Sequence, residues 1–308
     1  MLLMHSLWQQ LHLYRVIKVT GDWQYANPFF LEIKAIMKKY LVLPLLVLLC
    51  SKITFGQVLD SAYLKCVYKL TYVPDSLKPE KKRTDVLHLL IGKHVSTFFS
   101  YDNYRADSAL RTDIQNSVAA ANDYLKNPKL GAMYRKPGLY SEYQLFIDYP
   151  KSKITTTDLL VSTAYLYEEE TEKISWKIKK DTATVNGFLC QKATGDFHGR
   201  AYNAWFALKF PMNAGPYKFS GLPGLIVKVA DTREHYSYEL TAIEKLAAKM
   251  PVILNPEKYI RTSRKDFRSG VKKAFENPYQ ALTGNGTTIK GDTKWLQKSM
   301  PYNPIELF

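Results

Sequence analysis

Short strand-like segments separated by turn residues dominate the chain between residues 143 and 246, and they constrain the fold more than any other feature. The segments are rich in β-branched and aromatic residues, which favour a pleated, half-buried surface. Asn186-Gly187 and His198-Gly199 stand between segments and are typical of tight turns. The expected strands are residues 143–148, 153–159, 165–168, 174–178, 188–197, 200–210, 225–230 and 236–246. Because no strand–helix alternation accompanies them, the pattern predicts an antiparallel sheet that curls or closes.

Three further segments nearer the N-terminus follow the same pattern. Residues 63–73 alternate well enough for a half-buried strand. Residues 86–91 and 95–101 flank Gly92-Lys93, as the two arms of a hairpin would. These segments are predicted to join the same sheet.

Two segments have the spacing of helices. Residues 104–126 are predicted to form the main helix, because apolar residues such as Leu110 and Ile114 recur there at helical intervals. A shorter helix is expected near residues 266–275, with Ser263 as its N-cap. The 22 tyrosines of the chain favour sheet elsewhere. We therefore expect a mainly β (α+β) fold, a curved antiparallel sheet or half-barrel with one main helix, resembling lipoprotein-carrier-like folds.

The order of segments near the N-terminus is that of a secretory signal peptide. Met37 is followed by two lysines, residues 40–49 are almost wholly apolar, and Gly56 ends the region with a small residue. The apolar run is well short of the ~20 residues that a membrane-spanning helix needs. A signal peptide over residues 37–56, cleaved after Gly56, is therefore predicted, and residues 1–36 are interpreted as an extension from a start assigned too early.

A competing interpretation makes Cys50 a lipidated N-terminus of the exported protein. Such processing normally requires a small residue before the cysteine, and this chain has Leu49 there. The first residue of the exported protein separates the two cases, since it would be Gln57 or Cys50. Either way, the predicted location is the periplasm, the outer membrane or the exterior, with no transmembrane segment in the mature chain.

Removal of residues 1–56 takes away six basic and two acidic residues, so the net charge falls from +15 to +11. An exported protein of this charge could bind anionic envelope lipid headgroups or acidic glycans, or could simply have a solvated basic surface. No segment resembles a nucleic-acid-binding module. The same removal leaves two cysteines, Cys66 and Cys190, which are predicted either to form a disulfide or to be separately buried thiols.

One hexapeptide carries a family resemblance. Its residues are Gly221, Leu222, Pro223, Gly224, Leu225 and Ile226, preceded by Gly215-Pro216-Tyr217-Lys218-Phe219-Ser220. The sequence GLPGLI in this setting resembles the GLPGLI family, and upstream residues such as Trp176 and Asn186-Gly187-Phe188 also look like that family's pattern. The resemblance covers about residues 57–246 and implies a secreted or periplasmic protein of Gram-negative bacteria, in a family without an established activity. After Met250 the composition changes to one rich in Pro, Lys and Asn, which predicts a β domain over residues 57–250 and a basic C-terminal extension over residues 251–308, with one short helix and a mobile end.

The hexapeptide also has a physical interpretation. Pro223 followed by Gly224 is typical of a type II turn, so these residues could form a rigid corner between core strands. Alternatively, the glycines let backbone N–H groups approach a ligand, with Tyr217, Lys218 and Phe219 at the rim of the loop. Arg200 is a further candidate ligand anchor, or else the partner of an acid such as Asp196.

The sequence contains few patterns typical of catalysis or metal binding. No nucleophile elbow, phosphate loop or dinucleotide fingerprint occurs, so no catalytic constellation, cofactor or metal is predicted, and an enzyme is not favoured. His88 and His94 could be neighbours in the hairpin, but a third metal ligand is missing. The acidic run at residues 168–172 could hold a cation or form a solvated turn.

Two function classes remain. The first is a non-enzymatic binding or carrier module, in which a curved sheet encloses an apolar or amphipathic ligand. The second is an interaction partner of an outer-membrane transporter or surface assembly. An internal cavity favours the first class, and a filled interior with an exposed aromatic patch favours the second.

Overall fold

The computed structural model describes residues 56–101, 143–161, 163–284 and 294–307, all of them within the compact unit Phe55–Phe308. The predicted signal peptide up to Phe55, including Cys50, and the predicted main helix at residues 104–126 lie outside the described residues. Most of the end predicted to be mobile, at residues 285–293, also lies outside them.

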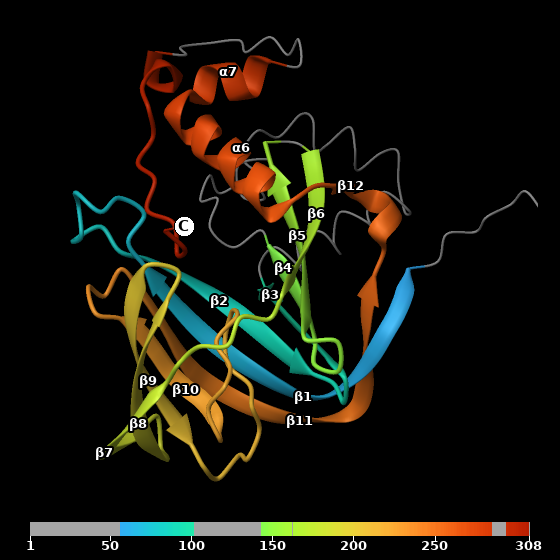
Figure 1. The fold of residues 1–308 in the computed structure, drawn as a ribbon, viewed down its shortest axis with the longest axis vertical. Coiled ribbons are helices and arrows are strands. Elements are labelled where there is room, and N and C mark those ends of the chain that lie inside the picture. The colour runs from blue at the N-terminus through green and yellow to red at the C-terminus, as the bar shows by residue number, and fades with distance from the viewer. Residues whose placement is uncertain (1–55, 102–142, 162, 285–293, 308) are drawn as a thin grey trace, which may run out of the picture. The chain divides into compact units, whose positions relative to one another are not determined.

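The described residues form one open sheet of twelve strands (Figure 1). The strands are β1 (Gln57–Tyr72), β2 (Arg83–Ile91), β3 (Val95–Ser100), β4 (Gln144–Asp148), β5 (Lys153–Leu160), β6 (Thr163–Glu170), β7 (Lys177–Val185), β8 (Phe188–Phe197), β9 (Arg200–Ala207), β10 (Leu225–Asp231), β11 (Tyr236–Leu254) and β12 (Ile260–Arg261). Their order is β12-β6-β5-β4-β3-β2-β1-β11-β10-β9-β8-β7, and all pairs are antiparallel except the short β12–β6 pair. The expected curved antiparallel sheet is confirmed, and it does not close on itself.

The two longest strands, β1 and β11, pair at the centre of the sheet and bend together (Figure 1). Their ladder shifts register near Val58, Ala62 and Val67. Such bulges insert an unpaired residue and increase the local bend of a strand. β11 continues to Leu254, past the domain boundary expected at residue 250.

Strand β7 shows where the sequence pattern fails. The expected strand at residues 174–178 is wrong, because residues 171–176 are not strand and β7 begins at Lys177. β7 is the last strand on one edge of the sheet and most of its residues are exposed. A strand without a buried face carries no hydrophobic alternation, so the pattern could not identify it.

Helix α6 (Arg264–Glu276) covers one end of the sheet (Figure 1). The prediction of a helix here is confirmed: Ser263 is its N-cap, and the Ser263 hydroxyl accepts a hydrogen bond of 3.0 Å from the Asp266 amide. Phe267 packs against Tyr165 and Tyr167 of β6, with ring centroids 5.8 and 5.4 Å apart. The 3-10 turn η2 (Pro256–Lys258) precedes α6, and α7 (Pro278–Thr283) and η3 (Lys294–Gln297) follow it.

The two cysteines are free thiols, not partners in a disulfide. Cys66 lies on β1 and Cys190 on β8, and three strands separate β1 from β8 in the sheet order. At ~4.8 Å per strand they are about 19 Å apart along the sheet, beyond the ~7 Å reach of a disulfide. Both are buried, and burial raises the pKa of the Cys66 thiol to about 12. The alternative of two separately buried thiols therefore describes this structure.

No helix among the described residues has the length and apolar character needed to cross a membrane.

Candidate functional site

The GLPGLI hexapeptide forms a packed corner between β9 and β10. A Cβ atom on Gly224 would lie 2.4 Å from the carbonyl oxygen of Ala207, so only glycine permits this approach of the two backbones. The predicted type II turn is wrong, because the positive φ belongs to Gly221 (97°) and not to Gly224. Leu225 and Ile226 are fully buried, and the Ile226 carbonyl accepts a hydrogen bond of 2.7 Å from the Tyr68 hydroxyl. The hexapeptide is thus a structural corner that positions the residues before it.

The three residues expected at the rim of this loop are all buried. Phe219 packs in the core against Phe197 and Tyr202, with centroid distances of 5.5 and 4.7 Å. Tyr217 has a positive φ of 55° and, with Lys218, directs its polar end toward the chain's last described residues. The loop therefore presents its polar side chains to the interior.

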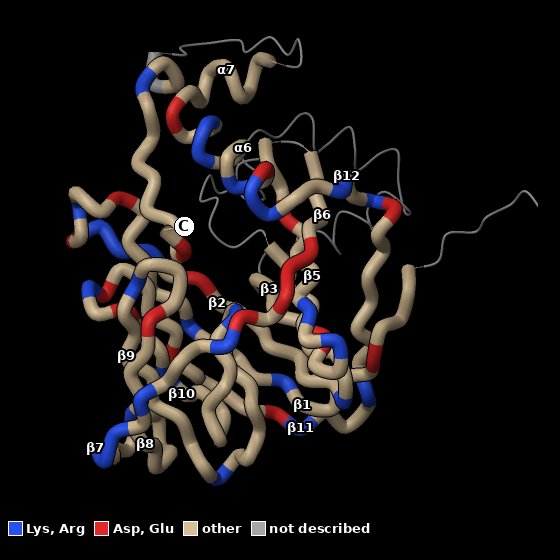
Figure 2. The backbone as a smooth tube through the Cα atoms, in the orientation of Figure 1, with Lys and Arg blue, Asp and Glu red and all other residues tan. Residues whose placement is uncertain are grey.

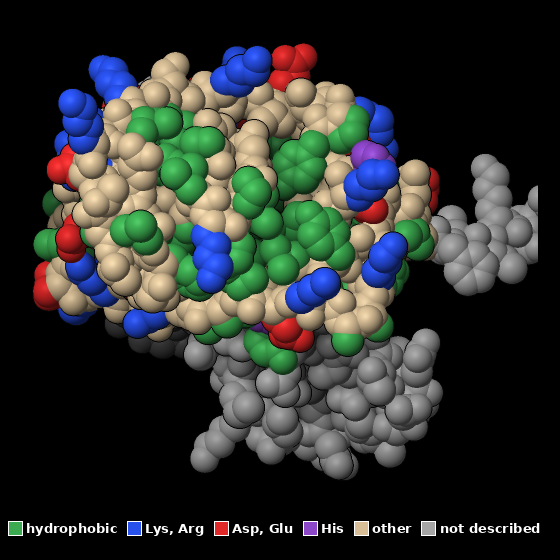
Figure 3. All heavy atoms as spheres, turned by 90° about the horizontal axis from the view of Figure 1, so that it is seen from below, with side chains coloured by type: hydrophobic (Ala, Val, Ile, Leu, Met, Phe, Trp, Pro, Cys, Tyr) green, Lys and Arg blue, Asp and Glu red, His purple; other side chains and the backbone are tan. Residues whose placement is uncertain are grey.

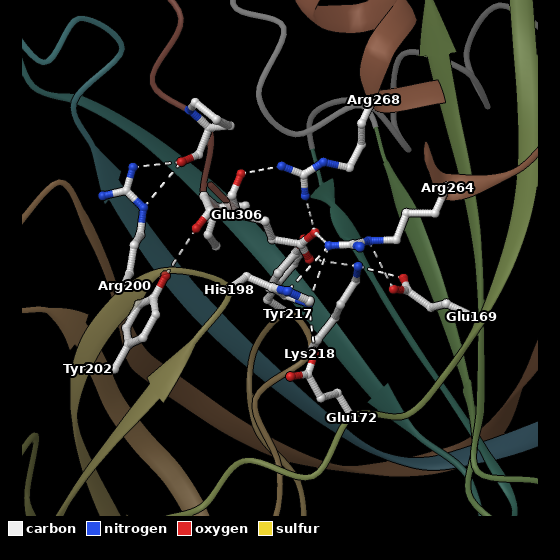
Figure 4. A network of polar contacts seen from close by, with 12 residues as sticks. Glu169, Glu172, His198, Arg200, Tyr202, Tyr217, Lys218, Arg264, Arg268 and Glu306 are labelled. Carbon is white, nitrogen blue, oxygen red and sulfur yellow. Dashed lines mark hydrogen bonds and ion pairs between the residues drawn. The ribbon is translucent and has the colours of Figure 1, made fainter. Parts of the chain in front are cut away.

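Glu306 is the residue on which these side chains converge (Figure 4). Its Oε1 atom accepts hydrogen bonds from the Tyr217 hydroxyl at 2.5 Å and from Lys218 Nζ at 2.8 Å. Its Oε2 atom accepts a bond of 2.6 Å from Arg264 and another from Arg268, both on α6. The Glu306 side chain is only 4% exposed. One buried carboxylate therefore joins the motif loop to the helix.

The surroundings keep this carboxylate ionised. Burial by itself would raise the pKa of Glu306, but the Lys218 ammonium, the Tyr217 hydroxyl and the Arg264 guanidinium together lower that pKa well below its ordinary value. Hydrogen bonds with an ionised partner are about twice as strong as neutral ones. The hydrogen bonds that Glu306 accepts from the motif loop and from α6 are therefore strong ones.

A second carboxylate balances the remaining charge. Glu169, near the end of β6, forms ion pairs with Lys218 at 2.6 Å and with Arg264 at 3.3 Å. Figure 2 shows this acidic stretch of β6 and the basic start of α6. His198 lies nearby and is 3.1 Å from Glu172; burial lowers the pKa of His198. Part of the acidic run at residues 168–172 is thus half-buried against cations of the chain itself.

Arg200 anchors a second buried cluster beside the first (Figure 4). It pairs with Asp231 at 3.0 Å, and not with the expected Asp196. The same guanidinium donates to the Asn303 side chain at 2.7 Å and to the Pro304 carbonyl at 2.6 Å. All of these contacts reach residues that are far from Arg200 in the sequence.

A cavity of about 120 Å³ lies between the sheet, α6 and residues 302–306. Six tyrosines, from the sheet and from residues outside it, are the most frequent residue type in its lining: Tyr143, Tyr167, Tyr217, Tyr236, Tyr238 and Tyr302. Phe267, Val271 and Phe275 of α6 form its apolar side, and Arg268 and Glu306 belong to its polar side. The Tyr143 and Tyr238 hydroxyls are 3.5 Å apart, and burial raises both pKa values, so these phenols stay protonated at neutral pH.

The sequence points to Arg200, Tyr217 and Lys218, but not to the residues that they contact or that surround them: Asn303, Glu306, Arg264 and Arg268. The two arginines belong to a visible basic cluster at residues 261–273. Asn303 and Glu306 gave no local signal, because an isolated Asn and Glu near the end of a polar segment resemble solvated residues. Their role follows only from contacts with residues at least 38 positions away in the chain.

The two histidines considered for a metal site are not brought together. His88 on β2 pairs with Phe99 and stacks on Tyr101, with ring centroids 4.5 Å apart, whereas His94 lies in the turn after β2. In the part of the chain that the structure describes, no group of three or more His, Cys, Asp or Glu residues could hold a metal ion.

Comparison with known proteins gives one short family match. Residues 198–228 match the family described as "Protein of unknown function (Porph_ging)", a domain typical of Bacteroidetes proteins. None of the curated proteins matches the chain. Two solved structures of PNGF-II, in space groups P21 and C2, are similar to 70% of this chain, with 11% identity and a TM-score of 0.46. The chain covers 34% of the length of those structures. The segment that carries Arg200, Tyr217, Lys218 and the hexapeptide is thus similar to a domain of unknown function.

Proposed function

We propose that this chain is an exported, non-enzymatic binding or carrier module for an apolar or amphipathic ligand, held in the tyrosine-lined cavity. The observation that carries the proposal is the cavity itself, which lies on the curved sheet under α6. Its lining combines aromatic faces with a few polar groups, which is the usual composition of a small-molecule site.

The size of the cavity limits what can enter. A cavity of about 150 Å³ in an apolar core accepts a benzene molecule. The present cavity, of about 120 Å³, suits one small ring or the ring-sized part of a larger amphipathic molecule. The protonated hydroxyls of Tyr143 and Tyr238 can donate a hydrogen bond to an oxygen of such a ligand. The net positive charge of the chain favours an anionic lipid or glycan as the source of the ligand.

Phenol is a suitable probe, because it has one ring and one hydroxyl. Saturable binding of phenol to the full chain, measured by ligand-observed NMR, is the expected result. In Val271→Phe the larger side chain fills the cavity, and we expect phenol binding to fall about tenfold or more.

Lys272→Phe is the matched control, since it adds the same ring to the exposed side of the same helix and should leave phenol binding unchanged. Equal phenol binding by both variants would refute the cavity as the site. If phenol binds in the cavity, native mass spectrometry of protein purified from its own cells is the experiment that identifies the physiological ligand.

The alternative, an interaction partner of an outer-membrane transporter or surface assembly, is favoured by a different observation. Leu189 on β8 is 71% exposed and Ile178 on the edge strand β7 is 50% exposed. Figure 3 shows a face on which apolar side chains are exposed between Lys and Arg residues. If this alternative holds, Leu189→Ser should reduce sedimentation with outer-membrane vesicles. Leu77→Ser, which changes a still more exposed leucine in a loop, should not.

A further inference from the structure

Residues 303–307 are bound by the rest of the chain in the way that a protein binds a peptide ligand. We propose that Arg200, Tyr202, Tyr217, Lys218, Tyr236 and the arginines of α6 form a binding site for an extended acidic peptide with Asn followed three residues later by Glu. In this structure the chain's own segment occupies the site. This inference goes beyond the cavity ligand proposed above and does not depend on it.

Every backbone carbonyl of residues 303–306 accepts a hydrogen bond from a side chain of the preceding part of the chain, which we call the body (residues 56–284). The Tyr236 hydroxyl donates to the Asn303 carbonyl at 2.6 Å, and Arg200 donates to the Pro304 carbonyl. The Tyr202 hydroxyl donates to the Ile305 carbonyl at 3.3 Å, and Arg268 donates to the Glu306 carbonyl. These hydrogen bonds involve only the backbone of the segment, so any extended peptide could accept them.

The two polar side chains of the segment supply the specificity. The Asn303 amide donates to the Val73 carbonyl at 2.7 Å, and its oxygen accepts from Arg200 at 2.7 Å. Glu306 occupies the cluster of Tyr217, Lys218 and the two arginines. An amide and a carboxylate three residues apart are thus recognised by separate buried groups.

The segment does not belong to the sheet. Residues 301–307 contain no strand, and in the described part of the chain their one ordinary backbone–backbone bond joins the Leu307 amide to the His198 carbonyl at 2.8 Å. Pro304 has no N–H that would need a partner. Side chains of the body therefore make nearly all of the polar contacts, as in recognition of a separate peptide.

The charge of the site requires an anionic occupant. Without Glu306, Lys218 and Arg264 would keep Glu169 as a carboxylate partner, and Arg268 would lose the carboxylate that it contacts in this structure. Removing one member of an ion-pair network that is largely buried is strongly unfavourable. The site is therefore stable when a carboxylate fills it, whether that carboxylate comes from this chain or from another one.

A tethered occupant competes with any external one, because a short linker gives it an effective concentration in the millimolar range. The test removes the tether but keeps all residues. A specific protease site is inserted after Gly284, the full chain is cut, and a labelled peptide of residues 300–308 is added while fluorescence anisotropy is measured. We expect the peptide to bind the cut chain about 100-fold more tightly than the uncut chain.

Two variant peptides distinguish specific binding of the glutamate side chain from nonspecific binding of the peptide. Replacement of the glutamate at position 306 by glutamine should weaken binding to the cut chain about tenfold or more, because the cations lose their charged partner. Replacement of Leu307, which is half exposed, by alanine should leave binding within about twofold.

Asn303→Ala in the uncut chain provides a second route should the cut chain unfold. This change weakens the internal segment but leaves its receptor intact, so binding of the wild-type peptide should appear. If neither protein binds the peptide while circular dichroism shows a folded chain, or if the glutamine peptide binds equally well, the proposal is wrong. Phenol binding is measured separately, so failure of one proposal is distinguishable from failure of the other.

Discussion

The motif corner at residues 221–226 and the segment at residues 303–307 reach the same part of the core by opposite means. The corner is held by backbone geometry and apolar burial, with Gly224 against the Ala207 carbonyl. The segment is held by hydrogen bonds and ion pairs from side chains far away in the sequence. A local pattern of Gly, Pro and Leu can be recognised without its partners, whereas a single carboxylate acquires its role only from the cations around it.

The largest expected effect comes from removing that carboxylate. Glu306→Ala leaves Lys218 and two arginines without their shared partner, and breaking a buried pair of this kind costs about 3–5 kcal/mol. Urea unfolding followed by circular dichroism measures the change. Glu257→Gln, which alters an exposed glutamate, should change the unfolding free energy by less than about 0.5 kcal/mol. Equal stability of the two variants would show that the segment contributes no fixed structure.

The motif corner should respond to a change of a single methyl group. In Gly224→Ala the added Cβ meets backbone atoms of Ala207, which cannot move aside as a side chain would. We expect a loss of about 3 kcal/mol, as for overpacking in a core. Gly187→Ala adds a methyl group in open space at a φ of 82°, so it should cost about 1 kcal/mol from backbone strain alone. The same urea titrations compare the two variants, and a larger loss at Gly187 would contradict the steric role of Gly224.

The pH dependence of stability distinguishes the two regions, because the segment depends on a titrating group and the corner does not. The pKa of Glu306 lies below its ordinary value of 4.5 in the folded chain, so the unfolded chain takes up this proton first. Its stabilisation is therefore complete above about pH 5 and is lost as the pH falls toward the folded pKa. At pH 3 the loss should be about 2 kcal/mol, from ~1.36 kcal/mol per pH unit below the unfolded value.

In Glu306→Gln the unfolding free energy should not show this loss at low pH. Urea titrations of both proteins from pH 7 to pH 3 measure the difference. His198 contributes a separate decline that begins nearer neutral pH, since burial lowers its pKa below 6.5. Because the Glu306 charge also acts on the pKa of His198, the difference between the two curves includes a change in the His198 contribution. Parallel curves for the wild type and Glu306→Gln would mean that the carboxylate is not held in its ionised form.

The smallest expected effect is that of a reductant. Cys66 and Cys190 are separate free thiols, so neither region depends on a covalent link between them. The thermal midpoint should be the same with and without dithiothreitol, and both cysteines should react with iodoacetamide once the chain is unfolded. A drop in the midpoint on reduction would restore the disulfide as an explanation.

Much of the fold could be predicted from local patterns. The hairpin of β2 and β3, the strands from β8 to β10 and the capped helix α6 all show their periodicity, turn residues or cap in the sequence. The edge strand β7 could not be predicted in the same way, because neither of its faces is buried. The prediction of a type II turn at Gly224 is wrong. A glycine is required at this position because its backbone lies against Ala207, and not because its φ is positive.

The sequence alone determined a curved antiparallel sheet, a short capped helix and a glycine-dependent corner, since each depends on neighbouring residues and their intrinsic conformational preferences. It also marked Arg200, Tyr217 and Lys218 as residues of interest. Only the tertiary structure decided what these side chains hold, namely Asn303, Pro304 and Glu306. The physical reason is that a buried charge is stable only when its partners surround it in space, and here those partners are separated by up to about one hundred positions of the chain.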